Sequence, residues 1–140
     1  MYKDLDIYSK LFKQYKEYIN EKSTFAPKIL KKTPQSLSYF PTILMKETIN
    51  STSSQTTNCQ EFIDNLAYTI EIYTKDIVVG NTKYASDVVM RDLQYLTFEF
   101  FKNMKFNRDL CNTAEYIDQS IDRKIIIFSC KLNSWNGRII

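Results

Sequence analysis

Residues Asn65–Lys75 have the sequence NLAYTIEIYTK, and the other segments of the chain can be placed around them. Their β-branched and aromatic residues recur with a period of two, which is typical of a strand with two different faces. We expect one face to be buried, with residues Leu66, Tyr68, Ile70, Ile72 and Thr74. We expect the other face to be exposed to solvent, with residues Ala67, Thr69, Glu71, Tyr73 and Lys75. The pattern therefore predicts the central strand of a small antiparallel sheet.

Two segments have the three- and four-residue apolar spacing of amphipathic helices. The longer one, residues 81–105, is predicted to pack on the apolar face of the central strand, with Asn81 or Thr82 as its N-cap. The other, residues 4–22, carries a stripe of aromatic and aliphatic side chains. This stripe fits either a surface that binds a partner or a surface that packs on the protein's own sheet, and we favour the second interpretation.

Three further strands complete the predicted sheet, at residues 37–49, 107–115 and 122–132. Residues 23–36 contain two prolines, which interrupt a helix, and are expected to form a connector. The predicted fold class is α+β, a small and mostly antiparallel sheet of about four strands packed by two helices in the order α-β-β-α-β-β. We expect a single domain over residues 1–140, in which residues 1–36 form the N-terminal helix and connector.

Residues 50–60, with the sequence NSTSSQTTNCQ, are almost entirely polar. We expect a mobile loop here, because the segment has little apolar surface to bury. Loops of this length inside a compact domain are commonly functional or disordered. The functional interpretation is that the loop becomes ordered against a neighbouring subunit when an assembly forms.

Several kinds of chemical site are excluded by residue type. The chain has no histidine, which excludes a Ser-His-Asp triad and a histidine general base. Cys59, Cys111 and Cys130 are far apart and form no CxxC pair, so a zinc site is not expected. The sequence also lacks a glycine-rich phosphate-binding motif. We therefore expect no catalytic residues, no cofactor, no metal and no enzymatic activity.

The sequence also bears on the compartment in which the protein works. No apolar run approaches the roughly 20 residues that span a bilayer, and the first residues lack the pattern of a signal peptide. An odd number of scattered cysteines fits reduced thiols in a cytosolic setting. We therefore expect a protein that does not contact a membrane.

The net charge of +3 is distributed unevenly along the chain. Residues 1–46 hold nine lysines and four acids, whereas residues 47–140 carry a small excess of acids. A basic N-terminal part can indicate a nucleic acid or an acidic protein as partner. The lysines are nevertheless spread out and mixed with acids, which favours solvation of exposed helix and loop surfaces.

Three runs of sequence carry a resemblance to a known family. They are YTIEIYTK at residues 68–75, FFKNMKFNR at residues 100–108, and NTAEYIDQSIDRKIIIFSCKLN at residues 112–133. Together with Phe40-Pro41 in the first predicted strand, they resemble the tail terminator (tail completion) proteins of long-tailed bacteriophages. The resemblance covers about residues 37–137, and the chain departs from the family pattern by lacking a glycine before Phe106 and by carrying Phe128 where an Arg/Tyr pattern is more usual.

The resemblance implies a structural role in a phage particle. Such proteins form a ring, expected to be a hexamer, on the head-proximal end of the completed tail tube. The ring ends tube polymerisation and provides the surface for head–tail joining. The implied partners are further copies of the chain, the tail tube protein, the head-side connector or neck protein and, in contractile particles, the last sheath ring. DNA would pass through the lumen without sequence-specific binding, and the protein would be located in the virion tail after assembly in the host cytoplasm.

Under this hypothesis, contacts with other subunits or with the tube are expected from the polar loop, the outer face of the central strand and the last strand pair. The residues concerned are Ser53, Gln55, Thr57, Glu71, Lys75, Arg108, Asp109, Arg123 and Lys124. Two alternatives stay open. One is a head–tail adaptor or neck protein of similar size, and the other is a small nucleic-acid-binding or regulatory protein that uses the basic N-terminal part.

Overall fold

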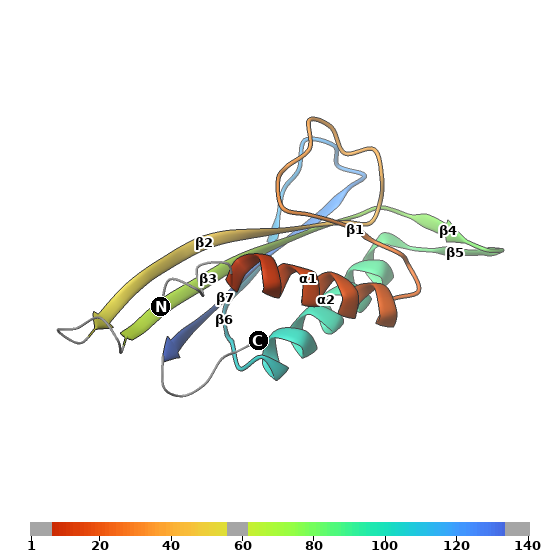
Figure 1. The fold of residues 1–140 in the computed structure, drawn as a ribbon. Coiled ribbons are helices and arrows are strands. Elements are labelled where there is room, and N and C mark those ends of the chain that lie inside the picture. The colour runs from red at the N-terminus through yellow and green to blue at the C-terminus, as the bar shows by residue number, and fades with distance from the viewer. Residues whose placement is uncertain (1–6, 56–61, 134–140) are drawn as a thin grey trace.

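The computed structural model describes residues 7–55 and 62–133 and has the expected α+β architecture (Figure 1). Within these ranges it contains two helices and seven strands. Their order is α1 (Ile7–Lys22), β1 (Lys28–Leu30), β2 (Thr42–Gln55), β3 (Phe62–Thr74), β4 (Ile77–Val79), β5 (Thr82–Tyr84), α2 (Ser86–Asn103), β6 (Asn107–Ala114) and β7 (Asp122–Asn133).

The main sheet has five strands in the order β1-β2-β3-β7-β6. The β1–β2 pair is parallel and the other three pairs are antiparallel, so the sheet is mostly antiparallel, as predicted. The central strand of the prediction, now β3, is the middle strand of the five. The remaining strands, β4 and β5, form a separate two-stranded hairpin that projects from the right side of Figure 1.

Both helices cover the same face of the sheet, below it in Figure 1. The predicted buried residues of β3, from Leu66 to Thr74, are all at most 1% exposed. They meet side chains from α1, α2 and the neighbouring strands, among them Leu11, Tyr15, Ile19, Ile43, Met45, Val89, Leu93, Phe100, Phe101, Ile126 and Phe128. Burial of this apolar surface, at about 25 cal/mol per Å², is the main force that holds the helices to the sheet. The prediction that both helices pack on the protein's own sheet is confirmed.

The N-terminal half differs from the prediction in three places. The connector contains β1, which pairs with the start of β2 through Lys28↔Thr42. The strand predicted at residues 37–49 begins later, at Thr42, directly after the cis Phe40-Pro41 peptide. Residues 50–55 of the predicted loop belong to β2, because pairing with β3 satisfies their backbone groups although their side chains are polar. Residues 56–60 lie outside the described part of the chain, so mobility of the loop stays a prediction.

The start of α2 is also different. Residues 77–84 form the β4–β5 hairpin, and the helix begins at Ser86 instead of Asn81 or Thr82. The backbone N–H of Ser86 donates to the Asp76 carboxylate at 2.8 Å, so a side chain ten residues earlier satisfies one of the free donors of the first turn. A cap that comes from across a hairpin has no local sequence signature, and this explains the error.

The largest correction concerns the outer face of β3, which was expected to be exposed to solvent. Ala67, Glu71 and Tyr73 are only 4–5% exposed. A second apolar cluster covers part of this face and consists of Leu44, Tyr73 and Ile121, with Leu30, Leu37, Phe40 and Tyr116 packed against it. The loops 31–41 and 115–121, which lie above the sheet in Figure 1, supply much of this cover, and we call them the lid. The sheet is therefore buried on both faces where the lid lies.

The depth of the helix-side core predicts the effect of truncating Ile70, which is 0% exposed. Ile70→Ala should lower the free energy of unfolding by about 3 kcal/mol, because it removes buried methyl groups and leaves a cavity. Urea denaturation followed by circular dichroism measures the change. Ile117, at 99% exposed, provides the matched control, and Ile117→Ala should change stability by less than about 0.5 kcal/mol. Equal effects of the two substitutions would contradict the described core.

Candidate interaction site

The outer face of the sheet holds a network of charged groups centred on Glu71. Its two carboxylate oxygens face Lys46 Nζ at 2.8 Å and Arg123 Nη2 at 2.6 Å. The Tyr73 hydroxyl donates to the same carboxylate at 2.7 Å. These residues lie on β2, β3 and β7, so a single carboxylate connects three neighbouring strands.

The strand register explains why these side chains meet. Glu71 is paired with Leu44 on β2 and with Ile125 on β7, and Tyr73 is paired with Arg123. Side chains two positions apart on a strand share a face, so Lys46 and Arg123 reach Glu71 diagonally from either side. The Arg123 guanidinium also lies over the Tyr73 ring, 5.5 Å from its centroid, which adds a cation–π contact.

The environment keeps Glu71 charged. Burial on its own raises the pKa of this carboxyl, but hydrogen bonds from Lys46, Arg123 and Tyr73 outweigh it and lower the pKa to about 2. The pKa of Tyr73 is raised, first by burial and then by its hydrogen bond to the carboxylate, so the phenol stays a donor. The carboxylate of Glu71 is thus fully partnered within the protein, although the buried Nε of Arg123 has no hydrogen-bond partner among the described residues. The expectation that Glu71 is exposed to solvent is therefore wrong, whereas a contact of Glu71 or Arg123 with another subunit stays a prediction.

Other predicted contact residues lie apart from this network. Lys75 follows β3 directly and its Nζ lies 5.7 Å from the Phe40 ring centroid, beside the lid. Arg108 and Asp109 are exposed at the start of β6, where the register with β7 shifts. Lys124 is half-buried on the helix side of β7. Among the predicted residues whose side chains the structure describes, Glu71 and Arg123 form an ion pair with each other.

Three predicted residues belong to the polar segment. Ser53 and Gln55 are in the second half of β2, which pairs with β3 to form the far end of a long hairpin. Figure 1 shows this hairpin extending beyond both helices on the left. Thr57 lies outside the described residues, so its predicted contact stays a prediction.

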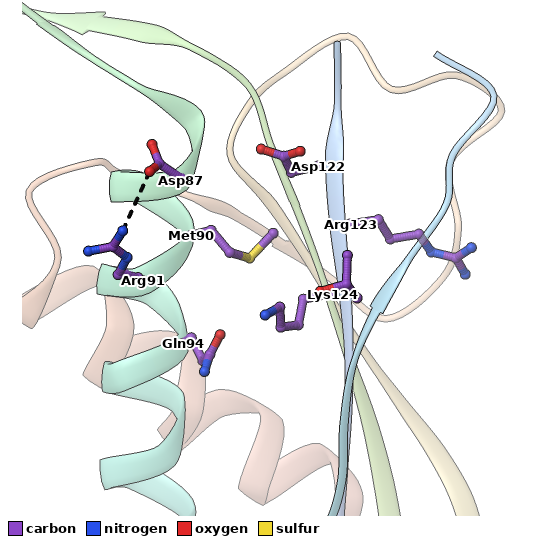
Figure 2. A pocket seen from close by; sticks show the side chains of 8 residues that line it. Asp87, Met90, Arg91, Gln94, Asp122, Arg123 and Lys124 are labelled. Atoms are coloured by element: carbon purple, nitrogen blue, oxygen red, sulfur yellow. Dashed lines mark ion pairs between the residues drawn. The ribbon is translucent and has the colours of Figure 1, made fainter. Parts of the chain in front are cut away.

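A shallow groove of about 270 Å³ separates α2 from the strands β6 and β7. It is lined by Asp87, Met90, Arg91, Gln94, Thr113, Asp122, Arg123 and Lys124. Figure 2 shows Lys124 extending towards the helix, whereas the Arg123 guanidinium points away from it. Arg91 forms an exposed ion pair with Asp87 at 3.5 Å, marked by the dashed line. Because acids and bases are mixed around its rim, the groove fits a polar contact surface.

The prediction missed the exposed apolar side chains. Val78 and Val79 lie on the β4–β5 hairpin, and Val88 and Tyr95 lie on α2 with 45% and 62% of their surfaces exposed. The sequence contained a signal for the last two, because they are seven residues apart and therefore share one side of the helix. The apolar spacing of the helix grouped Val88 with Val89 in one stripe, but of the two only Val89 is buried.

Other kinds of site can be assessed in the part of the chain that the structure describes. There, no three Cys, Asp or Glu side chains gather in a way that would hold a metal ion. No helix of residues 7–55 and 62–133 has the length and apolarity to span a membrane. A scan against protein-family models and a search of curated proteins both give no match to this chain.

The Glu71 network predicts a large effect of a small substitution. Glu71→Gln removes the charge and leaves Lys46 and Arg123 facing a neutral amide. The free energy of unfolding should fall by roughly 2 kcal/mol. This loss is smaller than that expected for a fully buried ion pair, because the Lys46 side chain is partly exposed to solvent. Urea denaturation at pH 7 measures this. The matched control is Asp87→Asn, which breaks an exposed pair and should cost less than about 0.5 kcal/mol.

The same group predicts a pH dependence. Because the folded pKa of Glu71 is about 2 and the unfolded value is near 4.5, its stabilising contribution is complete above about pH 5. It should decline as the pH falls from 5 towards 2, since the unfolded state then takes up the proton first. Stability curves of wild type and Glu71→Gln should therefore converge over this range. A difference that stays constant from pH 7 to pH 3 would show that the carboxylate charge is not responsible.

Proposed function

We propose that the protein is a tail terminator of a long-tailed bacteriophage or a phage-tail-like particle. In this role it forms a ring of identical subunits, expected to be a hexamer, that caps the head-proximal end of the tail tube and joins the tail to the head. It acts as a structural component and not as an enzyme. The proposal rests on the sequence resemblance, and the shape of the main sheet supports it.

The supporting observation is the long β2–β3 hairpin and its outer edge. β1 covers this edge only as far as Leu44, and the Tyr8 hydroxyl then donates to the Met45 carbonyl. Within the described residues, no strand pairs with the outer edge of β2 from there to Gln55. The segment Thr48–Gln55 contains no charged residue and no proline, two features that commonly protect a free edge, although its register with β3 shifts between Glu47 and Ile49 and between Thr52 and Ser54. Such an edge is suited to pairing with another chain.

The sheet has a second outer strand at its opposite side, β6. A ring requires two different surfaces on each subunit, one for each neighbour, related by a rotation that closes. The extended part of β2 on one side, with Ser53 and Gln55, and exposed Arg108 and Asp109 of β6 on the other, supply two such surfaces. The ion network at Glu71 lies between them and keeps the intervening strands in register.

A specific observation also favours the nucleic-acid alternative. The lysines of α1 and the connector are exposed, among them Lys10, Lys13, Lys16, Lys28 and Lys32. Glu17 and Glu21 on the same helix are exposed as well, which reduces the positive field. We therefore rank this function second.

Particles that lack this protein provide the test. If it ends tube growth, tails assembled without it should be longer than normal, variable in length and without heads, because nothing stops addition of tube subunits. Electron microscopy of lysates measures tail length and the fraction of tails with heads. Supplying the intact protein from a plasmid should restore both.

Other outcomes would redirect the proposal. Tails of normal length that fail only to attach heads would indicate a head–tail adaptor. Normal particles, together with DNA binding by the purified protein that weakens steeply between low and moderate salt, would favour the nucleic-acid function.

A further inference from the structure

Helix α2 carries a second, exposed stripe on the side that faces away from the core. It consists of the exposed residues Val88, Arg91, Tyr95 and Lys102 together with Phe98, which is partly buried and also packs against the core, and we call it the outer stripe. The intervals between its members alternate between three and four residues, which is the spacing of a seam in helix–helix packing. The buried side of the same helix has its own stripe, with Val89, Leu93, Leu96 and Phe100. Helix α2 therefore has two stripes with the spacing of a helix-packing surface. The core covers the stripe that contains Val89 and Leu93, and the outer stripe lies on the opposite side of the helix.

The outer stripe is accessible and contains large side chains. Val88 is 45% exposed and Tyr95 is 62% exposed, and the Arg91 side chain is 79% exposed. A surface helix normally has mainly charged and polar residues on this side. Tyrosine and arginine are also the residues most often enriched at binding hot spots. The combination indicates a contact surface.

At its C-terminal end the outer stripe leads into a small pocket of about 300 Å³. The pocket is lined by Phe98, Lys102, Phe106, Arg108 and Phe128. The Arg108 guanidinium lies 4.6 Å from the Phe98 ring centroid, and the Phe98 and Phe128 rings meet edge to face. Phe128 in turn stacks on the buried Phe101 at 4.2 Å, so the aromatic floor is held by the core. The pocket is open to solvent, and the position of its aromatic side is fixed by the core.

The charges along this surface favour an acidic partner. Arg91, Lys102 and Arg108 supply three cations, while Asp87 and Glu99 are the acids on this side of the helix. Arg91 has a long, exposed contact with Asp87, and no ion pair of Lys102 or Arg108 is found among the described residues. Lys102 and Arg108 line the aromatic pocket, and the exposed Asp109 follows Arg108 in the sequence.

We propose that the outer stripe is the docking site for an amphipathic helix of a partner protein, with apolar residues at three- and four-residue spacing and acidic residues flanking them. From Val88 to Lys102 the stripe is about 21 Å long, which matches four turns of a partner helix. This inference deepens the proposed function, since it names the chemistry of one assembly partner and rests on that function for its biological role. The binding itself can be measured independently.

Two other occupants fit the surface less well. A second copy of α2 would place the cations of one stripe against those of the other. A nucleic acid would meet Asp87 and Glu99 as well as the three cations, and the alternating apolar positions would remain unused. An acidic amphipathic helix uses both the apolar seam and the charges.

The probe is a fluorescein-labelled peptide of three heptads, with leucine at positions a and d and glutamate at positions e and g, so that it stays monomeric at neutral pH. Its matched counterpart has lysine in place of every glutamate. Fluorescence anisotropy with the full chain should show that the glutamate peptide binds at least about tenfold more tightly. Tyr95→Ala should weaken this binding about tenfold, because it removes the most exposed apolar contact.

The charge variant Arg91→Glu/Lys102→Glu should reverse the preference in favour of the lysine peptide, which general destabilisation would not do. The matched control Lys13→Glu/Lys16→Glu makes the same charge change on the exposed side of α1 and should leave peptide binding unchanged. Circular dichroism verifies that all variants are folded.

The inference is overturned if the glutamate peptide does not bind, if both peptides bind equally, or if the α1 control loses binding to the same extent. Competition by an oligothymidylate would assign the surface to nucleic acid, and concentration-dependent sedimentation lost in Tyr95→Ala would assign it to a second copy. Neither peptide measurement depends on tail length in particles that lack the protein. The inference and the proposed function can therefore fail separately.

Discussion

The buried carboxylate of Glu71 is the interaction on which the sheet depends. It lies between two cations from neighbouring strands, Lys46 and Arg123, and the lid packs beside it. A carboxylate buried without these partners would be costly, so the buried position of Glu71 depends on the register that brings Lys46 and Arg123 beside it. The network therefore selects one register for the strands and permits the sheet to be covered on its second face.

The lid covers only part of the second face of the sheet, so the sheet has two regions. Near the lid, Leu44 and Tyr73 are buried opposite the helix-side core, so the strands are enclosed on both sides. Further along β2 and β3, the hairpin extends beyond the helices. The enclosed region can act as a rigid base for the extended one. This arrangement suits a subunit that contacts its neighbours through strands and strand edges. The proposed ring requires contacts of this kind.

Much of the architecture was predictable from residue spacing. The alternation in Asn65–Lys75 correctly identified the middle strand, and the apolar spacing of residues 81–105 correctly placed a helix on it. Elements with a long and regular pattern were found because a buried stripe must repeat with the period of its backbone. The short strand β1 and the β4–β5 hairpin were missed, because three residues are too few to show a period. The polar residues 50–55 were predicted as a loop, although backbone pairing with β3 makes them a strand.

The sequence by itself determined the α+β class, the central strand with its helix-facing residues, and the absence of histidine chemistry. Only the tertiary structure decided the role of the other face of β3. Alternation shows which residues share a face, but not what covers that face. Loops from distant parts of the chain pack on Tyr73, and strand register brings Lys46 and Arg123 to the Glu71 carboxylate. Glu71 and Tyr73, which alternation placed on an exposed face, are buried, because burial depends on neighbours that are close in space and far apart in sequence.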